Sequence, residues 1–277
     1  MIAFLEGDTV GMKRVAAQSR EKPGVDDWMS NAEGFVSAYS GRLEVAREMS
    51  RSAADFARNS GRRDAEALYE ADAALREALF GNVAAARQRA ARAVVLSKSR
   101  DVAYGAAFAF ALTGDSRSQQ LTDELSRRLP EDTTVRFVYA PTLSAFLALN
   151  QNRPSKAVEL LQTAIPYELG IANGGGSEPI LGAGSLYPAY VRGLAYLAAH
   201  RGAEAAVEFQ KILDHRSIVI CDPVGVVAHV QLARAYAISG NKTKAKSAYQ
   251  DFLTLWKDAD PDIPILKQAH VESANLN

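Results

Sequence analysis

Small and aromatic residues recur along the chain with a spacing that predicts pairs of antiparallel helices. The two clearest copies each place a run containing small residues, then an alanine, then an aromatic residue: 193–196, Ala205 and Phe209, followed by 233–236, Ala245 and Tyr249. A helix-breaking turn separates the two halves of each copy, at residues 200–202 and 239–241. Small residues let paired helices approach closely, and the aromatic side chain fills the wedge against the next pair. We therefore expect helix pairs that stack on one another.

Further turn residues at similar intervals predict more degenerate pairs upstream: Gly7, Gly41, Gly81, Gly114 and Asn152. The sequence indicates one array over residues 1–277, and the start at Gly7 resembles a repeat that lacks most of its first helix, as in a chain cut from a longer one. We expect a partial repeat at 1–24, repeats at about 25–60, 61–99, 100–131, 132–166, 186–216 and 223–257, a glycine-rich insertion at 167–185 and a capping helix at 262–277.

The composition supports an all-α interpretation and excludes several classes of partner. Hydrophobic residues make up 48% of the 277 residues, which is ample for a continuous core. Convincing runs of alternating β-branched residues are absent, so no sheet is expected. The 32 basic residues balance the 32 acidic ones, and we therefore expect neither direct nucleic-acid binding nor membrane insertion. The start of the chain does not resemble a signal peptide, and the single cysteine excludes an internal disulfide framework.

The sequence contains no motif that would predict catalysis. The triple glycine at 174–176 is not followed by the lysine and hydroxyl residue of a P-loop, and Gly182 and Gly184 lack the third glycine of a dinucleotide fingerprint. Neither a His-Glu-x-x-His zinc motif nor a Gly-x-Ser-x-Gly nucleophile elbow occurs. We therefore expect no enzyme activity, no cofactor and no metal.

Two breaks in the helical pattern leave alternatives open. The segment 167–185 is either a lid that grips a ligand or a tolerated insertion. The linker between the last two repeats carries four side chains that can each ligate a metal, and its other interpretation is a solvated turn with a buried thiol: Asp214, His215, Cys221 and Asp222. His229, on the following helix, is interpreted as a packing residue in preference to a catalytic one.

The spacing Leu232-Ala233-x-x-Tyr236 and Ala205-x-x-x-Phe209 resembles the tetratricopeptide repeat. This resemblance implies a right-handed superhelix whose first helices line a concave, ligand-binding face. The positions that correspond to that face carry mostly aromatic residues: Trp28, Phe35, Tyr104, Phe108, Tyr139, Phe146, Tyr187, Tyr190 and Leu194. They form either an exposed binding groove or an ordinary core stripe. The lysine, asparagine and arginine with which family members grip a terminal carboxylate are absent there, so no such clamp is expected.

Longer runs resemble the C-terminal repeat region of acidobacterial-type serine/threonine protein kinases and related transcriptional regulators: Ala3–Asp8, Ala73–Asn82, Phe209–Arg216 and Leu255–Lys267. The sequence lacks the glycine-rich loop, His-Arg-Asp and Asp-Phe-Gly motifs of a kinase. The resemblance implies a sensory or scaffolding module attached to a signalling enzyme. Its location would be cytoplasmic, or extracytoplasmic if the parent protein carries a membrane segment.

Two functions follow as expectations. The first is a non-catalytic module that binds a protein or peptide, including the kinase domain of its own parent. The second is a small-molecule sensor whose pocket lies under residues 167–185.

Overall fold

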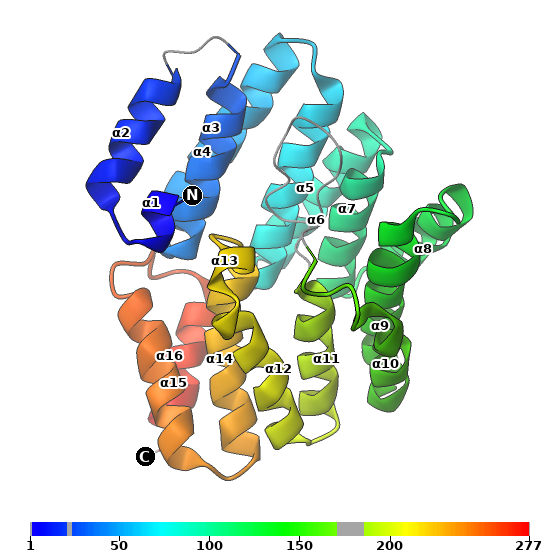
Figure 1. Ribbon diagram of the computed structural model, residues 1–277, viewed down its shortest axis with the longest axis vertical. Helices are drawn as coiled ribbons and strands as arrows, with labels where there is room; N and C mark the ends of the chain where they lie inside the picture. Colours follow the sequence, from blue (N-terminus) through cyan, green and yellow to red (C-terminus); the bar gives the residue numbers. More distant parts are fainter. Residues whose placement is uncertain (1, 21–23, 171–185, 277) are drawn as a thin grey trace.

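The computed structural model describes residues 2–20, 24–170 and 186–276, and all the regular structure in these ranges is helical. The expected all-α class is confirmed, and adjacent helices pack as pairs (Figure 1). The N-terminal half contains α1 (Ile2–Leu5), α2 (Thr9–Arg20), α3 (Asp26–Tyr39), α4 (Leu43–Asn59), α5 (Arg63–Leu79), α6 (Val83–Leu96), α7 (Arg100–Leu112) and α8 (Arg117–Arg128). The C-terminal half contains η1 (Val135–Tyr139), α9 (Ala140–Asn150), α10 (Pro154–Leu160), η2 (Leu161–Ala164), α11 (Tyr187–Ala198), α12 (Gly202–Asp214), α13 (Arg216–Val219), α14 (Pro223–Ile238), α15 (Lys242–Leu255) and α16 (Pro264–Ala274).

The predicted turns end the first helix of each pair, and left-handed backbone makes them tight. At Gly41 the φ angle is 73°, and the backbone N–H of Arg42 donates to the carbonyl of Ser37 at 2.9 Å, which closes the last turn of α3. A Cβ on Gly41 would lie only 2.3 Å from the Cβ of Ala259. Glycine is therefore required here both for the turn and for the approach of a distant segment.

The first and last helices of the array lie next to each other, one set above the other in the view of Figure 1, and hydrogen bonds join them. The indole Nε1 of Trp256 donates to the carbonyl of Tyr39 at 3.0 Å. The backbone N–H of Asp260 donates to the carbonyl of Gly41, also at 3.0 Å. In addition, the Asp260 carboxylate accepts from the backbone N–H of Glu44 at 2.7 Å. These contacts turn the stack of helix pairs into a closed array.

The helix at the C-terminus takes part in this closure. Helix α16 packs on α15, as expected of a cap, but Ile265 in its first turn donates a backbone hydrogen bond of 3.2 Å to the carbonyl of Phe80 at the α5–α6 turn. Ile265 and Leu266 are buried. The expected capping helix thus also connects the last pair to the turn between α5 and α6.

Helix α5 packs against α4, α6, α7 and α14 and buries charged side chains. Two of its acids are paired with arginines of neighbouring helices: Glu70 with Arg89 at 2.9 Å and Glu77 with Arg47 at 2.6 Å. Pairing offsets the cost of removing a charge from water, which an isolated buried carboxylate would not recover. The polar residues of α5 therefore fix how its neighbours pack around it.

Two further residues of α5, Asp72 and Arg76, are buried without an ion pair to a neighbouring helix among the described residues. One carboxylate oxygen of Asp72 accepts from the side-chain amide of Asn31 at 3.0 Å, and burial raises the pKa of Asp72 to about 8. The guanidinium of Arg76 lies 5.1 Å from the centre of the Phe35 ring and donates to Ser50, while burial lowers its pKa to about 10. At neutral pH Asp72 therefore holds its proton in the folded chain.

The contacts between paired helices lead to a first prediction. Ala245 is fully buried, so Ala245→Glu should lower the free energy of unfolding by roughly 3 kcal/mol, since it forces an unpaired carboxylate into a space that fits a methyl group. Lys246→Glu, at the neighbouring exposed position, is the matched control and should change little. Urea unfolding of both variants measures the difference, and equal stabilities would show that Ala245 does not lie at a close helix contact.

The raised pKa of Asp72 leads to a second prediction. Because the folded chain keeps a proton that the unfolded chain loses near pH 4, the free energy of unfolding should fall as the pH rises from 4 towards 8, by at most about 1.4 kcal/mol per pH unit for this group. Asp72→Asn keeps the shape but cannot ionise, and should flatten this dependence. Urea unfolding at pH 5 and pH 8 tests it, and parallel pH profiles of the two proteins would contradict it.

Candidate binding hollows between helix pairs

Helices α12 and α15 both pack against α14, and two hollows lie along the surface between them. The first, here the Arg216 hollow, has a volume of about 400 Å³ and lies where α14 begins. The second, the Val207 hollow, has about 520 Å³ and lies where α14 ends. Both volumes fall in the range typical of ligand sites.

The Arg216 hollow has an apolar floor and a polar rim. Ile212 and Leu213 from the end of α12 form the floor together with Val219 from α13. The rim carries Arg216, His229 of α14 and Asp251 of α15, with Tyr39 of α3 at the back. A Cβ on Gly225 would lie 2.4 Å from Val219 and 3.2 Å from the Tyr39 ring. A glycine at the start of α14 therefore lets these floor and wall residues meet.

The segment that supplies Arg216 and Val219 contains a strained residue. Ile220 has φ 51° and ψ −104°, a left-handed conformation that is rare for a β-branched residue and costs on the order of 1–3 kcal/mol. Its backbone N–H donates to the carbonyl of Arg216 at 2.7 Å. Packing of α13 against α14 maintains this geometry, and the strain therefore lies at the wall of the hollow.

His229 is half-buried between groups of opposite charge. Burial lowers its pKa, and among the smaller effects Asp251 raises it and Arg216 lowers it. At neutral pH the ring is therefore uncharged and offers one donor and one acceptor nitrogen. Burial also raises the pKa of Tyr39, so its hydroxyl stays protonated.

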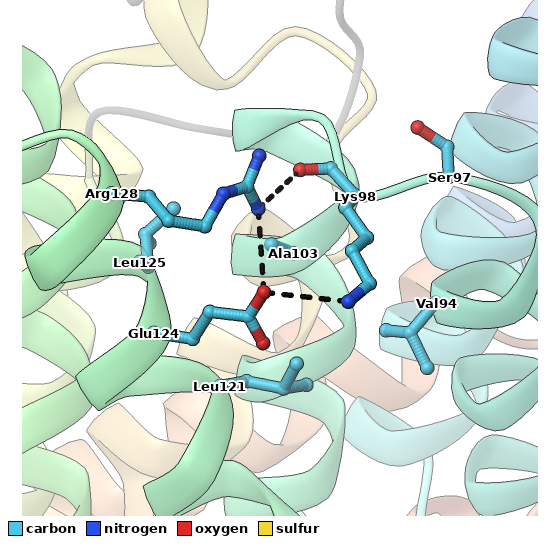
Figure 2. A pocket seen from close by; sticks show the side chains of 8 residues that line it. All are labelled: Val94, Ser97, Lys98, Ala103, Leu121, Glu124, Leu125 and Arg128. Atoms are coloured by element: carbon cyan, nitrogen blue, oxygen red, sulfur yellow. Dashed lines mark hydrogen bonds and ion pairs between the residues drawn. The ribbon is translucent and has the colours of Figure 1, made fainter.

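A corresponding hollow between α6 and α8 is lined by charged side chains that pair with one another (Figure 2). Glu124 lies 3.6 Å from the amine of Lys98 and 3.7 Å from the guanidinium of Arg128, and that guanidinium donates to the Lys98 carbonyl at 2.8 Å. In the Arg216 hollow, neither Arg216 nor Asp251 has an oppositely charged partner at ion-pair distance among the described residues. The Arg216 hollow thus has charges of both signs that are free to bind.

The Val207 hollow is more open and more apolar. Val207 is 64% exposed, and it lies beside Ala203 and the ring of Tyr236. The amine of Lys244 lies 5.4 Å above that ring. On the other rim Asp214 accepts from Gln210 at 2.8 Å. An apolar side chain of a ligand could pack here against Val207 and the Tyr236 ring, and an acidic group next to it could pair with Lys244.

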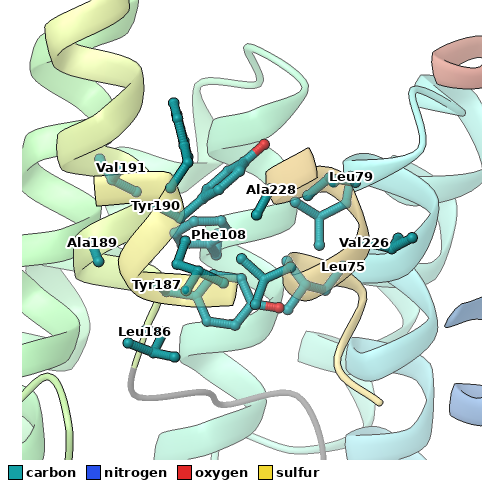
Figure 3. Close-up of a cluster of buried hydrophobic side chains, with 14 of the residues drawn as sticks. Leu75, Leu79, Phe108, Leu186, Tyr187, Ala189, Tyr190, Val191, Val226 and Ala228 are labelled. Atoms are coloured by element: carbon teal, nitrogen blue, oxygen red, sulfur yellow. The ribbon is translucent and has the colours of Figure 1, made fainter. Parts of the chain in front are cut away.

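The aromatic residues expected to form a concave groove are mostly core. Seven are at most 7% exposed: Phe35, Tyr104, Phe108, Tyr139, Phe146, Tyr187 and Tyr190. Trp28 and Leu194 are half-buried. Helices α11 and α14 lie against α5 and α7, so residues such as Phe108, Tyr187 and Leu75 fill the space that an open groove would need (Figure 3). The expectation of an exposed aromatic site is wrong for these seven residues.

Polar contacts also occupy this interior. The rings of Tyr104 and Tyr139 stack at 3.7 Å, and the hydroxyl of Tyr187 donates to Asp222 at 2.9 Å. Asp222 also accepts from the backbone N–H of Val224, where it caps the start of α14. These aromatic residues therefore stabilise the closed array.

The four potential metal ligands of the linker do not converge. Asp214 and His215 line the Val207 hollow, whereas Cys221 and Asp222 are buried. Burial raises the pKa of the Cys221 thiol to about 12. In the ranges that the structure describes, no three histidine, cysteine, aspartate or glutamate side chains form a group that could hold a metal ion. Residues 171–185, most of the expected insertion, lie outside the described residues.

Neither hollow was predictable as a whole from the sequence, because each is built from several separate helices. One signal was present: Lys242, Lys244 and Lys246 alternate through the first turns of α15. Cations are unfavourable at a helix N-terminus, where the macrodipole is positive. Such a cluster indicates a surface that is suited to an anionic group.

Comparison of the chain with protein-family models, with curated proteins and with solved structures found no match. Across residues 2–20, 24–170 and 186–276, the helices are too short or too polar to cross a membrane.

The burial of the aromatic residues leads to a third prediction. Phe146 is 7% exposed and its ring lies 5.5 Å from that of Phe108, so Phe146→Ala should lower the free energy of unfolding by roughly 3 kcal/mol through the cavity it leaves. Phe56→Ala removes the same side chain from a more exposed position on α4 and serves as the control. Equal losses in the two variants, measured by urea unfolding, would argue that Phe146 is not a core residue.

Proposed function

We propose that this chain is a non-catalytic protein-interaction module that holds an acidic, apolar segment of a partner in the Val207 hollow. The exposure of Val207 carries the proposal, within a hollow whose rim holds Lys244, a lysine without an ion pair among the described residues. The other lysine of the hollow, Lys211, is already paired with Glu168 and Glu208. An aliphatic anchor of the partner would cover Val207 and the Tyr236 ring. Burial of one such side chain contributes about 1.5–3 kcal/mol.

Charge selects the partner segment. Lys242, Lys244 and Lys246 add to the positive end of the α15 dipole. None of the three forms an ion pair with another described residue. Carboxylates placed against them would relieve this accumulation of like charge, whereas a basic segment would increase it. Electrostatic complementarity of this kind favours rapid and selective association.

The wider context of the proposal comes from the sequence resemblance. We propose a tetratricopeptide-like superhelix that belongs to the sensory or scaffolding part of a cytoplasmic bacterial signalling protein, such as a serine/threonine kinase. The partner segment would then include regions of the parent's own catalytic domain. The packed helix pairs are compatible with this family, and the closure of the array restricts binding to outer surfaces.

A peptide pair tests the proposed function. A fluorescent helical peptide with leucines on one face and glutamates beside them should bind the chain, and a copy with lysines in place of the glutamates should bind at least tenfold more weakly. Val207→Asp should weaken the acidic peptide at least tenfold, equivalent to about 1.4 kcal/mol, because it replaces the apolar anchor point with a repelling charge.

Val95→Asp is the matched control, since Val95 is also strongly exposed, at 74%, but lies on α6 away from the hollow. Fluorescence anisotropy at low and high salt gives the affinities, and circular dichroism checks that both variants remain folded. Equal binding by the two variants, or equal binding of the two peptides, would contradict the proposal.

A further inference from the structure

We infer that the Arg216 hollow binds a small zwitterion, namely a free α-amino acid with an aliphatic side chain. This inference does not depend on the docking of a partner in the Val207 hollow, because it uses different residues and a different ligand. It starts from the two unpaired charges on one rim: Arg216 and Asp251.

The positive charge of Arg216 and the negative charge of Asp251 together restrict the chemical class of the ligand. A simple carboxylic acid would pair with Arg216 but would meet the repulsion of Asp251, and a simple amine would do the reverse. A molecule with an ammonium and a carboxylate on the same carbon offers a partner to each, because Arg216 and Asp251 line the same hollow as His229. The guanidinium of Arg216 can bind a carboxylate through two parallel hydrogen bonds.

The floor of the hollow selects the side chain. Ile212, Leu213 and Val219 are apolar, and the first and last are buried. An aliphatic side chain on this floor would lose contact with water, whereas a charged one would be left without a partner there. The volume of about 400 Å³ lies near the lower end of ligand sites. This volume fits a single amino acid.

Neutral groups complete the site. The uncharged ring of His229 can donate one hydrogen bond, and Tyr39 carries a protonated hydroxyl at the back. Both can bind the ligand carboxylate without adding charge. The strained residue Ile220 follows the α13 turn that carries Arg216 and Val219, as expected where backbone is held in place for binding.

Isothermal titration calorimetry of the full chain tests the inference with three ligands: leucine, leucinamide, which lacks the carboxylate, and N-acetylleucine, which lacks the ammonium. Leucine should bind, and each analogue should bind at least tenfold more weakly. Arg216→Gln should weaken leucine at least tenfold without affecting leucinamide. Asp251→Asn should weaken leucine in the same way without affecting N-acetylleucine.

Glu124→Gln is the matched control, since it removes an acid from the corresponding α6–α8 hollow, where that acid is already paired. Its affinity for leucine should be unchanged. Arg216 and Asp251 are exposed, so both variants should fold, and thermal unfolding checks this. Equal affinities for the three ligands, no loss in either variant, or no binding of leucine, isoleucine, valine or methionine at millimolar concentration would overturn the inference.

Discussion

The packing of α14 against α3 and α5 is the contact on which the rest of the structure depends. It brings the last helix pair onto the first ones, and the backbone bonds that follow at Tyr39, Gly41 and Phe80 hold it there. A stack of helix pairs normally leaves its first helices facing an open groove. In this chain they face one another, so the aromatic side chains form a core and the inner surface cannot receive a partner.

The hollows therefore lie on the outside, between the second helices of neighbouring pairs. The α6–α8 and α12–α15 positions offer the same kind of hollow, but their side chains differ in what they leave unpaired. At the first, Glu124 is satisfied by Lys98 and Arg128. At the second, Arg216 and Asp251 lie on separate helices without pairing. Whether the charges of such a hollow are paired or unpaired thus depends on a few positions within a common framework.

Local features of the sequence were sufficient to predict the helices, because glycine at positions such as Gly41 and Gly240 must adopt left-handed backbone that ends a helix. The fate of the aromatic residues was not predictable, because a stripe such as Tyr104 and Phe108 has the same spacing whether it lines a groove or a core. That outcome depends on Trp256 meeting Phe80 at 5.0 Å, a contact between residues far apart in the sequence. The hollows escaped prediction for the same reason.

Closure also changes how the chain must fold. The hydrogen bond from Trp256 to Tyr39 joins residues that are 217 positions apart, whereas the contacts in an open array stay between neighbouring repeats. An open array can nucleate anywhere and gain stability one repeat at a time. Here a large loss of chain entropy precedes the contacts that seal the array. We therefore expect unfolding in a single cooperative step, in which the ends do not fray independently, and folding that is completed only after the last helices have left the ribosome.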